Sequence, residues 1–194
     1  FDVGAVNAKL GRFMPAGFYY KMFIHPRPMW KHVYEPIIRH AAGLGKAPKD
    51  RDADVYEHFY AHVDVMVVGG GIAGLSAALA AGRGGARVLL VEQTADWGGR
   101  APVDGAQIDG MDGDAWVKNA LQELESMSNV TCVARCMGAG VYDHGYALAY
   151  ERLTDHLADK DGPRHRLWRI RAKQIVTATG AIERPLSFAG NDIP

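Results

Sequence analysis

The fold of this chain is decided by residues 63–74, Val-Asp-Val-Met-Val-Val-Gly-Gly-Gly-Ile-Ala-Gly. Their first half is rich in Val and Met, which predicts a strand that is buried on both faces. Gly69, Gly71 and Gly74 then follow the G-x-G-x-x-G spacing, and an alanine-rich helix is predicted over residues 75–81. A strand, a glycine turn and a helix in this order are typical of a unit that binds a dinucleotide.

Each glycine of the turn has a separate expected task. Gly69 permits the tight turn, Gly71 lets a pyrophosphate approach the backbone, and Gly74 lets the helix pack closely on the strand. The phosphates are expected at the N–H groups that begin the helix, which include those of Ile72 and Ala73. The alternative is a glycine-rich turn between a strand and a helix that binds nothing.

The second predicted strand covers residues 87–91 and ends at Glu92, 18 residues beyond Gly74. An acidic residue at this strand end is expected to hold a ribose hydroxyl, and Gln93 beside it is a further expected cofactor contact. Glu92 disfavours NADP, since its carboxylate would repel a 2′-phosphate. NAD and FAD share the adenosine half, so the turn does not distinguish them.

Two further glycine-containing segments are expected at the nucleotide. Gly98 and Gly99 follow Glu92 at a spacing that brings a second loop near the cofactor, where Arg100 either meets a phosphate or lies in solvent. Thr179 and Gly180 follow a last parallel strand predicted over residues 174–178, and they allow close approach of the backbone at the nucleotide crevice. The alternative for Gly98 and Gly99 is an ordinary loop, since Gly-Gly is common in turns.

Between these segments the chain alternates helix and strand. An amphipathic helix is predicted over residues 112–127 with Asp112 as its N-cap, and a third parallel strand is predicted over residues 130–133. A small antiparallel meander is predicted over residues 141–170, inserted before the last parallel strand. The predicted fold class is therefore α/β, a Rossmann-like domain for FAD or NAD(P) with a parallel sheet and an inserted meander, preceded by an aromatic-rich, irregular arm.

Composition limits the possible functions. Twenty-two basic and twenty-two acidic residues cancel, which argues against nucleic acid as a partner, and the uncharged stretch at residues 65–81 is too short and glycine-rich for a membrane span. Cys132 and Cys136 are interpreted as structural thiols in a cytoplasmic protein. His58 and His62 stand four apart before the first strand, but a metal site needs further ligands that are not nearby, so no metal is predicted. No catalytic residue is proposed.

Residues 1–60 hold 11 of the 18 aromatic residues. Prolines among them disfavour helix, apart from one short helix predicted over residues 30–42, interrupted or started at Pro36. This segment is interpreted as an arm laid across a surface of a partner subunit or of its own domain. The predicted domains are this arm with its linker, residues 1–60, and a dinucleotide-binding domain that begins at residue 61 and is cut short at residue 194.

The layout of glycine turn, acidic strand end, second glycine loop, meander and closing loop resembles the two-dinucleotide-binding-domain flavoproteins. More distinctive phrases extend the resemblance over almost the whole chain, and they are similar to the family of heterotetrameric sarcosine oxidase alpha subunits. These phrases are Arg-Phe-Met-Pro-Ala-Gly-Phe-Tyr-Tyr-Lys at residues 12–21, Tyr-Glu-Pro-Ile-Ile-Arg at 34–39, Ala-Ala-Gly-Leu-Gly at 41–45, Val-Tyr-Asp-His at 141–144 and Thr-Gly-Ala-Ile-Glu-Arg-Pro at 179–185.

The resemblance implies an oxidoreductase complex that acts on a CH–NH donor, demethylating sarcosine to glycine and passing the methyl carbon to tetrahydrofolate. It implies NAD in this chain, with FAD as the alternative, while FMN and FAD serve the wider complex of alpha, beta, gamma and delta subunits. The chemistry would lie mostly in other subunits or domains, so this chain alone would be inactive. By position, the family's adenine contact corresponds to the backbone near Gly138. Arg100 and the two residues after it depart from the small, apolar residues expected there.

A second function remains open: an FAD-dependent reductase that takes electrons from NAD(P)H, or a subunit of an amine or imino-acid dehydrogenase. The lack of a redox cysteine pair after Gly99 argues against a disulfide reductase. The aromatic arm favours the oxidase subunit, because a self-contained reductase has less need of it.

Overall fold

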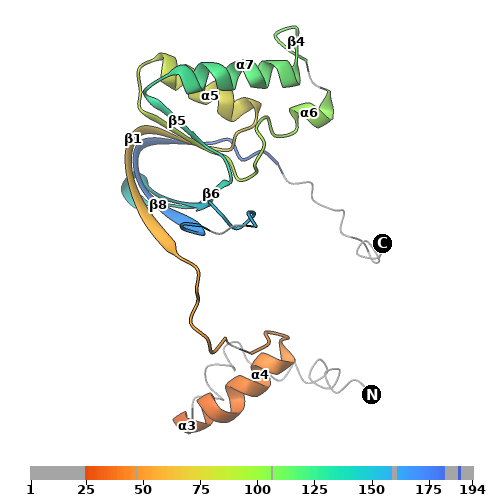
Figure 1. Ribbon diagram of the computed structural model, residues 1–194, viewed down its shortest axis with the longest axis vertical. Helices are drawn as coiled ribbons and strands as arrows, with labels where there is room; N and C mark the ends of the chain where they lie inside the picture. Colours follow the sequence, from red (N-terminus) through yellow and green to blue (C-terminus); the bar gives the residue numbers. More distant parts are fainter. Residues whose placement is uncertain (1–24, 47, 106, 159–160, 182–187, 189–194) are drawn as a thin grey trace. The chain divides into compact units, whose positions relative to one another are not determined.

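The computed structural model describes residues 25–46, 48–105, 107–158, 161–181 and 188, and the chain divides into two units at residues 52 and 53. In its described residues the first unit contains a helical segment made of α3 (Arg27–Met29), the π-helical turn η2 (Trp30–Tyr34) and α4 (Glu35–Ala41) (Figure 1). The predicted helix is therefore present, but it begins before Trp30, and Pro36 is the second residue of α4, inside the helical segment and just after the π-helical turn. The aromatic residues before position 25 lie outside the described residues.

The second unit is built on a six-stranded sheet with the order β5-β2-β1-β8-β7-β6. Four strands are parallel: β1 (Tyr56–Val68), β2 (Val88–Val91), β5 (Val130–Val133) and β8 (His165–Thr177). Strand β7 (Tyr146–Arg152) extends the sheet antiparallel to β8, and β6 (Cys136–Tyr142) pairs antiparallel with β7 at the edge. This arrangement confirms the predicted α/β class with a largely parallel sheet.

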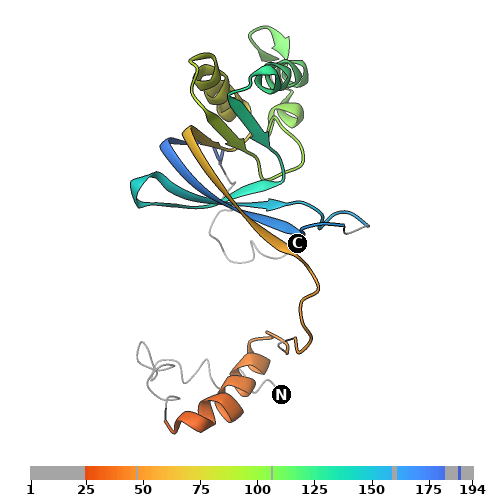
Figure 2. The same ribbon diagram turned by 60° about the vertical axis from the view of Figure 1, so that its left-hand side comes forward.

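Two helices, α5 (Ile72–Arg83) and α7 (Gly113–Ser126), lie side by side on one face of the parallel strands (Figures 1 and 2). Buried Leu75 from α5 and Leu124 from α7 share one apolar cluster with Val67 and Leu90 of the sheet. The predicted N-cap of α7 is confirmed, because the Asp112 side chain accepts a hydrogen bond from the Asp114 backbone N–H at 3.0 Å. The helices thus hold the first strand and its glycine turn against a rigid layer.

The segment before α7 contains short elements only. Helix α6 (Ala101–Asp104) follows the second glycine loop, and β3 (Gln107–Ile108) pairs antiparallel with β4 (Met111–Asp112). No helix in the described parts of the chain combines the length and the apolar character that a membrane crossing requires.

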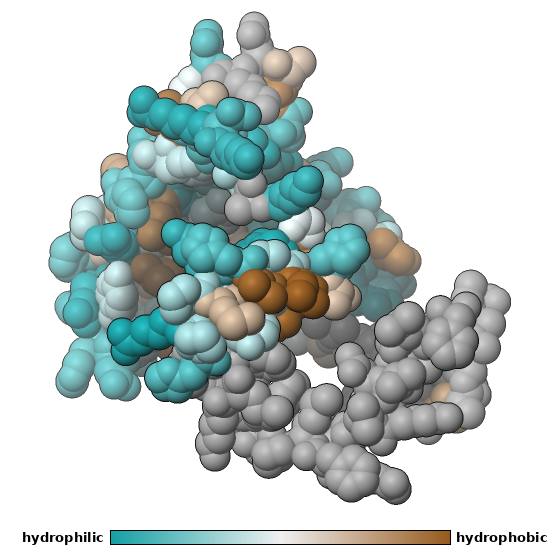
Figure 3. Space-filling view, turned by 90° about the horizontal axis from the view of Figure 1, so that it is seen from below, coloured by the Kyte–Doolittle hydropathy of each residue, from teal (hydrophilic) through white to brown (hydrophobic). Residues whose placement is uncertain are grey.

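The antiparallel end of the sheet bends under the parallel strands (Figures 1 and 2). Met66 and Leu89 from the parallel part share a second buried cluster with Ala147, Trp168 and Ile170 from the antiparallel part. Seen from below, hydrophilic residues predominate on the coloured surface, with a hydrophobic group near the centre of the view and smaller hydrophobic groups elsewhere (Figure 3). The bend therefore buries the inner face of the meander without a second layer of helices.

Two strand predictions were wrong in their bounds. Strand β1 begins at Tyr56, seven residues before the predicted start, so His58 and His62 lie within it and not before it. The first residues of β1 are polar or partly exposed, so their side-chain pattern does not predict a buried strand. Their backbone nevertheless pairs with β8, beginning with Tyr56 opposite His165. Backbone pairing, which the side-chain pattern does not reveal, extends the strand.

The meander is also not a separate insertion before the last strand. The end of the predicted meander and the strand predicted at residues 174–178 belong to one strand, β8, which pairs with β7 along its first half and with β1 along nearly its whole length. The meander thus shares its last strand with the parallel sheet. The predicted third parallel strand, residues 130–133, has the bounds of β5.

Candidate functional site

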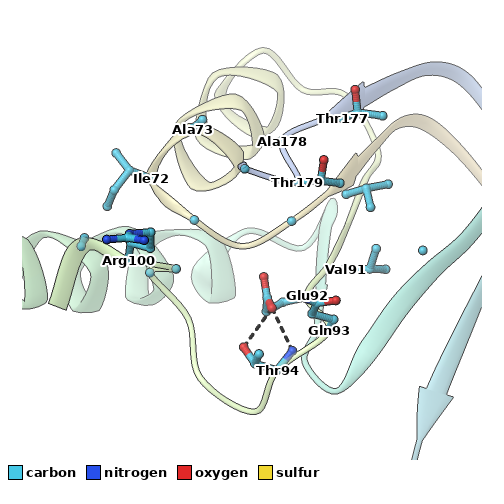
Figure 4. Close-up of a pocket in the computed structure, with 18 of the residues that line it drawn as sticks. Ile72, Ala73, Val91, Glu92, Gln93, Thr94, Arg100, Thr177, Ala178 and Thr179 are labelled. Atoms are coloured by element: carbon cyan, nitrogen blue, oxygen red, sulfur yellow. Dashed lines mark hydrogen bonds between the residues drawn. The ribbon is translucent and has the colours of Figure 1, made fainter. Parts of the chain in front are cut away.

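A cavity of about 850 Å³ lies where β1, β2 and β8 end. Twelve of the thirteen predicted cofactor contacts line it, and they come from segments more than 100 residues apart in the sequence (Figure 4). Gly74 alone among them does not line it. The lining contacts are Gly69, Gly71, Ile72, Ala73, Glu92, Gln93, Gly98, Gly99, Arg100, Gly138, Thr179 and Gly180.

The N-terminal end of α5 opens on this cavity. Gly71 is its N-cap and has no side chain to cap the helix, while the Leu75 backbone N–H is the first to bond within the helix, to the Gly71 carbonyl at 2.9 Å. The N–H groups of Ile72 and Ala73 come before that bond and so have no acceptor inside the helix. An anion is favoured there by these donors and by the positive end of the helix dipole.

Gly69 and Gly74 are required by close packing within the protein. Gly69 has φ of +107°, and a Cβ at this position would lie 2.3 Å from the Ala178 carbonyl oxygen. A Cβ on Gly74 would lie 1.8 Å from the Gly69 carbonyl oxygen. Gly74 therefore shapes the site from behind, by letting α5 pack against the turn, and does not line the cavity.

Gly71 differs from the other two. A Cβ here would have the Gly99 Cα, 3.9 Å away, as its nearest neighbour, and the backbone φ of −73° suits any residue. The protein itself therefore does not require glycine at this position. The space in front of Gly71 belongs to the cavity. If glycine is needed at this position, the need therefore comes from a ligand that fills this space. This geometry fits a phosphate.

Glu92 is 8% exposed, and its side chain forms part of the cavity wall (Figure 4). Its Oε1 accepts hydrogen bonds from the Thr94 backbone N–H at 2.8 Å and from the Thr94 hydroxyl at 2.9 Å. Its Oε2 accepts one, from the Gly70 backbone N–H at 2.6 Å. Since an ionised carboxylate oxygen has two acceptor positions, Oε2 has room for one more donor, such as a ribose hydroxyl.

The second glycine loop braces the first turn. The Gly98 N–H donates to the Gly70 carbonyl at 2.8 Å, and Gly71 and Gly98 form an isolated parallel bridge. The second glycine loop therefore contacts the first turn directly, in addition to lining the cavity where the cofactor is expected. Arg100 at the cavity mouth is paired with Asp104 at 3.1 Å, and this pairing raises the pKa of Arg100.

The meander holds the turn that follows Glu92. The Arg152 guanidinium donates to the Gln93 carbonyl at 2.9 Å, and the Arg135 backbone N–H donates to the Thr94 carbonyl at 2.8 Å. The Cys136 N–H likewise donates to the Glu92 carbonyl at 2.6 Å. These contacts come from a part of the sequence that local pattern does not connect with Glu92.

Several cavity residues were missed by sequence reasoning. Thr94, Asp104 and Met137 line the cavity, as does Thr177. Thr94 had a detectable signal, because a Thr two residues after an acidic strand end commonly hydrogen-bonds to nearby polar groups in a turn. The others had none, since their positions depend on how distant strands meet.

The ionisable side chains among the described residues of the cavity wall are Glu92, Arg100, Asp104 and Cys136. Burial raises the pKa of the Cys136 thiol to about 12, and burial also raises the pKa of Cys132 to about 11. Both thiols are therefore protonated near neutral pH and are poor nucleophiles. The described part of the wall therefore offers no thiolate nucleophile.

Comparisons with known proteins agree with this geometry. Residues 64–155 match the family model described as FAD dependent oxidoreductase. Sarcosine oxidase subunit alpha from Rhizobium meliloti (strain 1021) is 48% identical over 196 residues, which cover 100% of this chain and 20% of that protein. Sarcosine oxidase subunit alpha from Corynebacterium sp. (strain P-1) is 45% identical over 159 residues, covering 78% of this chain and 16% of that protein.

Among solved structures, L-proline dehydrogenase from P. horikoshii superposes with a TM-score of 0.54 and 28% identity. The match covers 77% of this chain and 28% of that chain. The chain spans about a fifth of the length of the sarcosine oxidase subunit alpha from Rhizobium meliloti.

Proposed function

Because this chain belongs to the family of sarcosine oxidase alpha subunits, we propose that it forms the dinucleotide-binding part of such a subunit. Its own task is to bind the adenosine diphosphate half of the cofactor. The uncapped start of α5 supports a phosphate site, and the open acceptor position on Glu92 Oε2 supports a ribose site in the same cavity.

In this proposal each wall of the cavity has one role. The N–H groups of Ile72 and Ala73 bind the pyrophosphate, and Gly71 leaves the space for it. Glu92 accepts a ribose hydroxyl, and the backbone of Gly138 lies at the adenine. Gly98 and Gly99 hold the turn from one side, while Thr179 and Gly180 close the cavity at the end of β8.

We propose NAD as the cofactor, with FAD as the alternative. Glu92 favours either of them over NADP, because a second phosphate on the ribose would face its carboxylate. The match to a family described as FAD dependent oxidoreductase is the specific observation in favour of FAD. Either group, when bound, supplies hydride chemistry, and this chain supplies its binding and orientation.

The complete protein is proposed to act within a complex of alpha, beta, gamma and delta subunits that oxidises sarcosine to glycine. The methyl carbon passes to tetrahydrofolate, and further flavins, FMN and FAD, lie elsewhere in that complex. The name of the curated relatives, subunit alpha, supports a multi-subunit enzyme. The absence of an acid–base pair among the described cavity residues fits chemistry carried out by other domains or subunits. Two free cysteines support a cytoplasmic location.

Two measurements test this function. The nucleotide released from the purified full-length protein is identified by mass and by its flavin absorbance, which separates NAD from FAD. Glu92→Ala is expected to lower the retained nucleotide, since a hydrogen bond to a charged acceptor contributes about 1.5–3 kcal/mol. Ser76→Ala, at an exposed position of α5, serves as the control. Undiminished nucleotide in Glu92→Ala would contradict the assigned role of the carboxylate.

A further inference from the structure

Thr94 makes the closest side-chain contact to the Glu92 carboxylate. It lies two residues beyond Glu92, in the turn after β2, and it lines the cavity while remaining exposed. Its backbone N–H is 2.8 Å and its hydroxyl oxygen 2.9 Å from the same carboxylate oxygen, Oε1 (Figure 4). Both donors that approach Oε1 therefore come from one residue.

This contact decides which oxygen remains for a ligand. Among the residues that the structure describes, only the Gly70 N–H donates to Oε2, at 2.6 Å, so the unfilled acceptor position of the carboxylate lies on Oε2. Without the Thr94 hydroxyl, Oε1 would have an unfilled position as well. The carboxylate would then be held in one orientation by fewer hydrogen bonds, and a hydroxyl donor of the ligand could bind to either oxygen.

The Thr94 hydroxyl also reaches the second glycine loop. Its oxygen lies 2.7 Å from the Asp96 carbonyl, and the loop continues to Gly98, whose N–H donates to the Gly70 carbonyl at 2.8 Å. A hydroxyl has one hydrogen, so it is shared between Glu92 Oε1 and the Asp96 carbonyl. Thr94 therefore links the ribose carboxylate to the loop that supports the phosphate turn.

We propose that Thr94 is a positioning residue for nucleotide recognition: it keeps Glu92 Oε1 occupied, so that Oε2 alone accepts a single ribose hydroxyl. The proposal rests on the proposed function, because it concerns the same adenosine diphosphate site. It makes the site selective between the two ribose hydroxyls, since one open acceptor position takes one donor. It also makes that selectivity depend on a residue that need not touch the nucleotide.

The test uses ADP, 2′-deoxyADP and 3′-deoxyADP as probes of the full-length protein freed of bound nucleotide. Dissociation constants are measured by calorimetry for the wild type, Thr94→Val and Thr94→Ser. Thr94→Val keeps the shape and the backbone N–H but removes the hydroxyl, and Thr94→Ser restores it. Because Thr94 is exposed, both variants are expected to fold, and their thermal midpoints check this.

The wild type is expected to bind one of the two deoxy probes about tenfold more weakly than ADP, which is the size of a hydrogen bond to a charged group. Thr94→Val should weaken ADP about fivefold and leave that deoxy probe unchanged, because the lost contact acts only through the missing hydroxyl. Thr94→Ser should bind all three probes as the wild type does.

Two results would overturn the proposal while the proposed function stands. Equal weakening of all three probes by Thr94→Val would show a general structural role, and no weakening of any probe would show that the hydroxyl does not act on the site. A wild type that binds none of the three nucleotides would refute the proposed function, and this proposal with it. The two failures are therefore distinguishable in one data set.

Discussion

The substitution Gly71→Ala tests whether glycine is needed at this position for folding or for ligand binding. The new Cβ would have its nearest protein atom, the Gly99 Cα, 3.9 Å away, and the φ of −73° is allowed for alanine. Stability should change by less than about 1 kcal/mol, because the lower entropy of the unfolded chain offsets a poorer helix cap. Folding is therefore expected to survive this substitution.

Binding is expected to respond differently. A methyl group in front of the start of α5 would occupy the space through which a phosphate approaches the N–H groups of Ile72 and Ala73. An extra methyl in a close contact costs about 1–3 kcal/mol, which weakens ADP binding by about 5- to 150-fold. Calorimetry with ADP measures the loss, and a thermal melt of the same sample measures stability.

The comparison has two refuting results. Affinity equal to that of the wild type would show that no phosphate approaches Gly71, and the placement of the pyrophosphate would be wrong. A large fall in the melting temperature would show that the protein itself needs glycine there. Ser76→Ala, on the exposed side of the same helix, controls for a general effect of alanine in α5.

The remaining predictions concern the fold and the assembly. Gly74→Ala places a Cβ 1.8 Å from the Gly69 carbonyl oxygen, so it should destabilise the protein by more than about 2 kcal/mol in chemical unfolding, and wild-type stability would contradict the packing described. Because burial raises the pKa of Cys136 from 9.0 to about 12, its thiolate fraction near neutral pH falls by about a thousandfold; alkylation should be slow in the folded protein and fast after unfolding. Equal rates in both states would refute that burial. Deletion of residues 1–46 should leave the α/β unit folded and impair subunit assembly, as measured by the size of the purified complex, and normal assembly would refute the interpretation of the arm.

The sequence by itself determined the local units of this protein. A run of apolar residues, a glycine spacing and an acidic strand end lie close together in the chain, and each follows from backbone geometry that acts over a few residues. The strand at residues 130–133 and the N-cap Asp112 were predictable for the same reason. Twelve of the residues that line the cavity were also predictable, because the carboxyl ends of neighbouring parallel strands meet at one edge.

Only the tertiary structure decided how the distant parts meet. The early start of β1 and the continuity of β8 come from backbone pairing across 109 residues between Tyr56 and His165, which leaves no local pattern in the side chains. The roles of Gly71 and Thr94 also depend on tertiary contacts, since one is defined by an unfilled space and the other by the single oxygen it leaves open. Spacing along a chain cannot specify either, because both are relations between atoms that folding alone brings together.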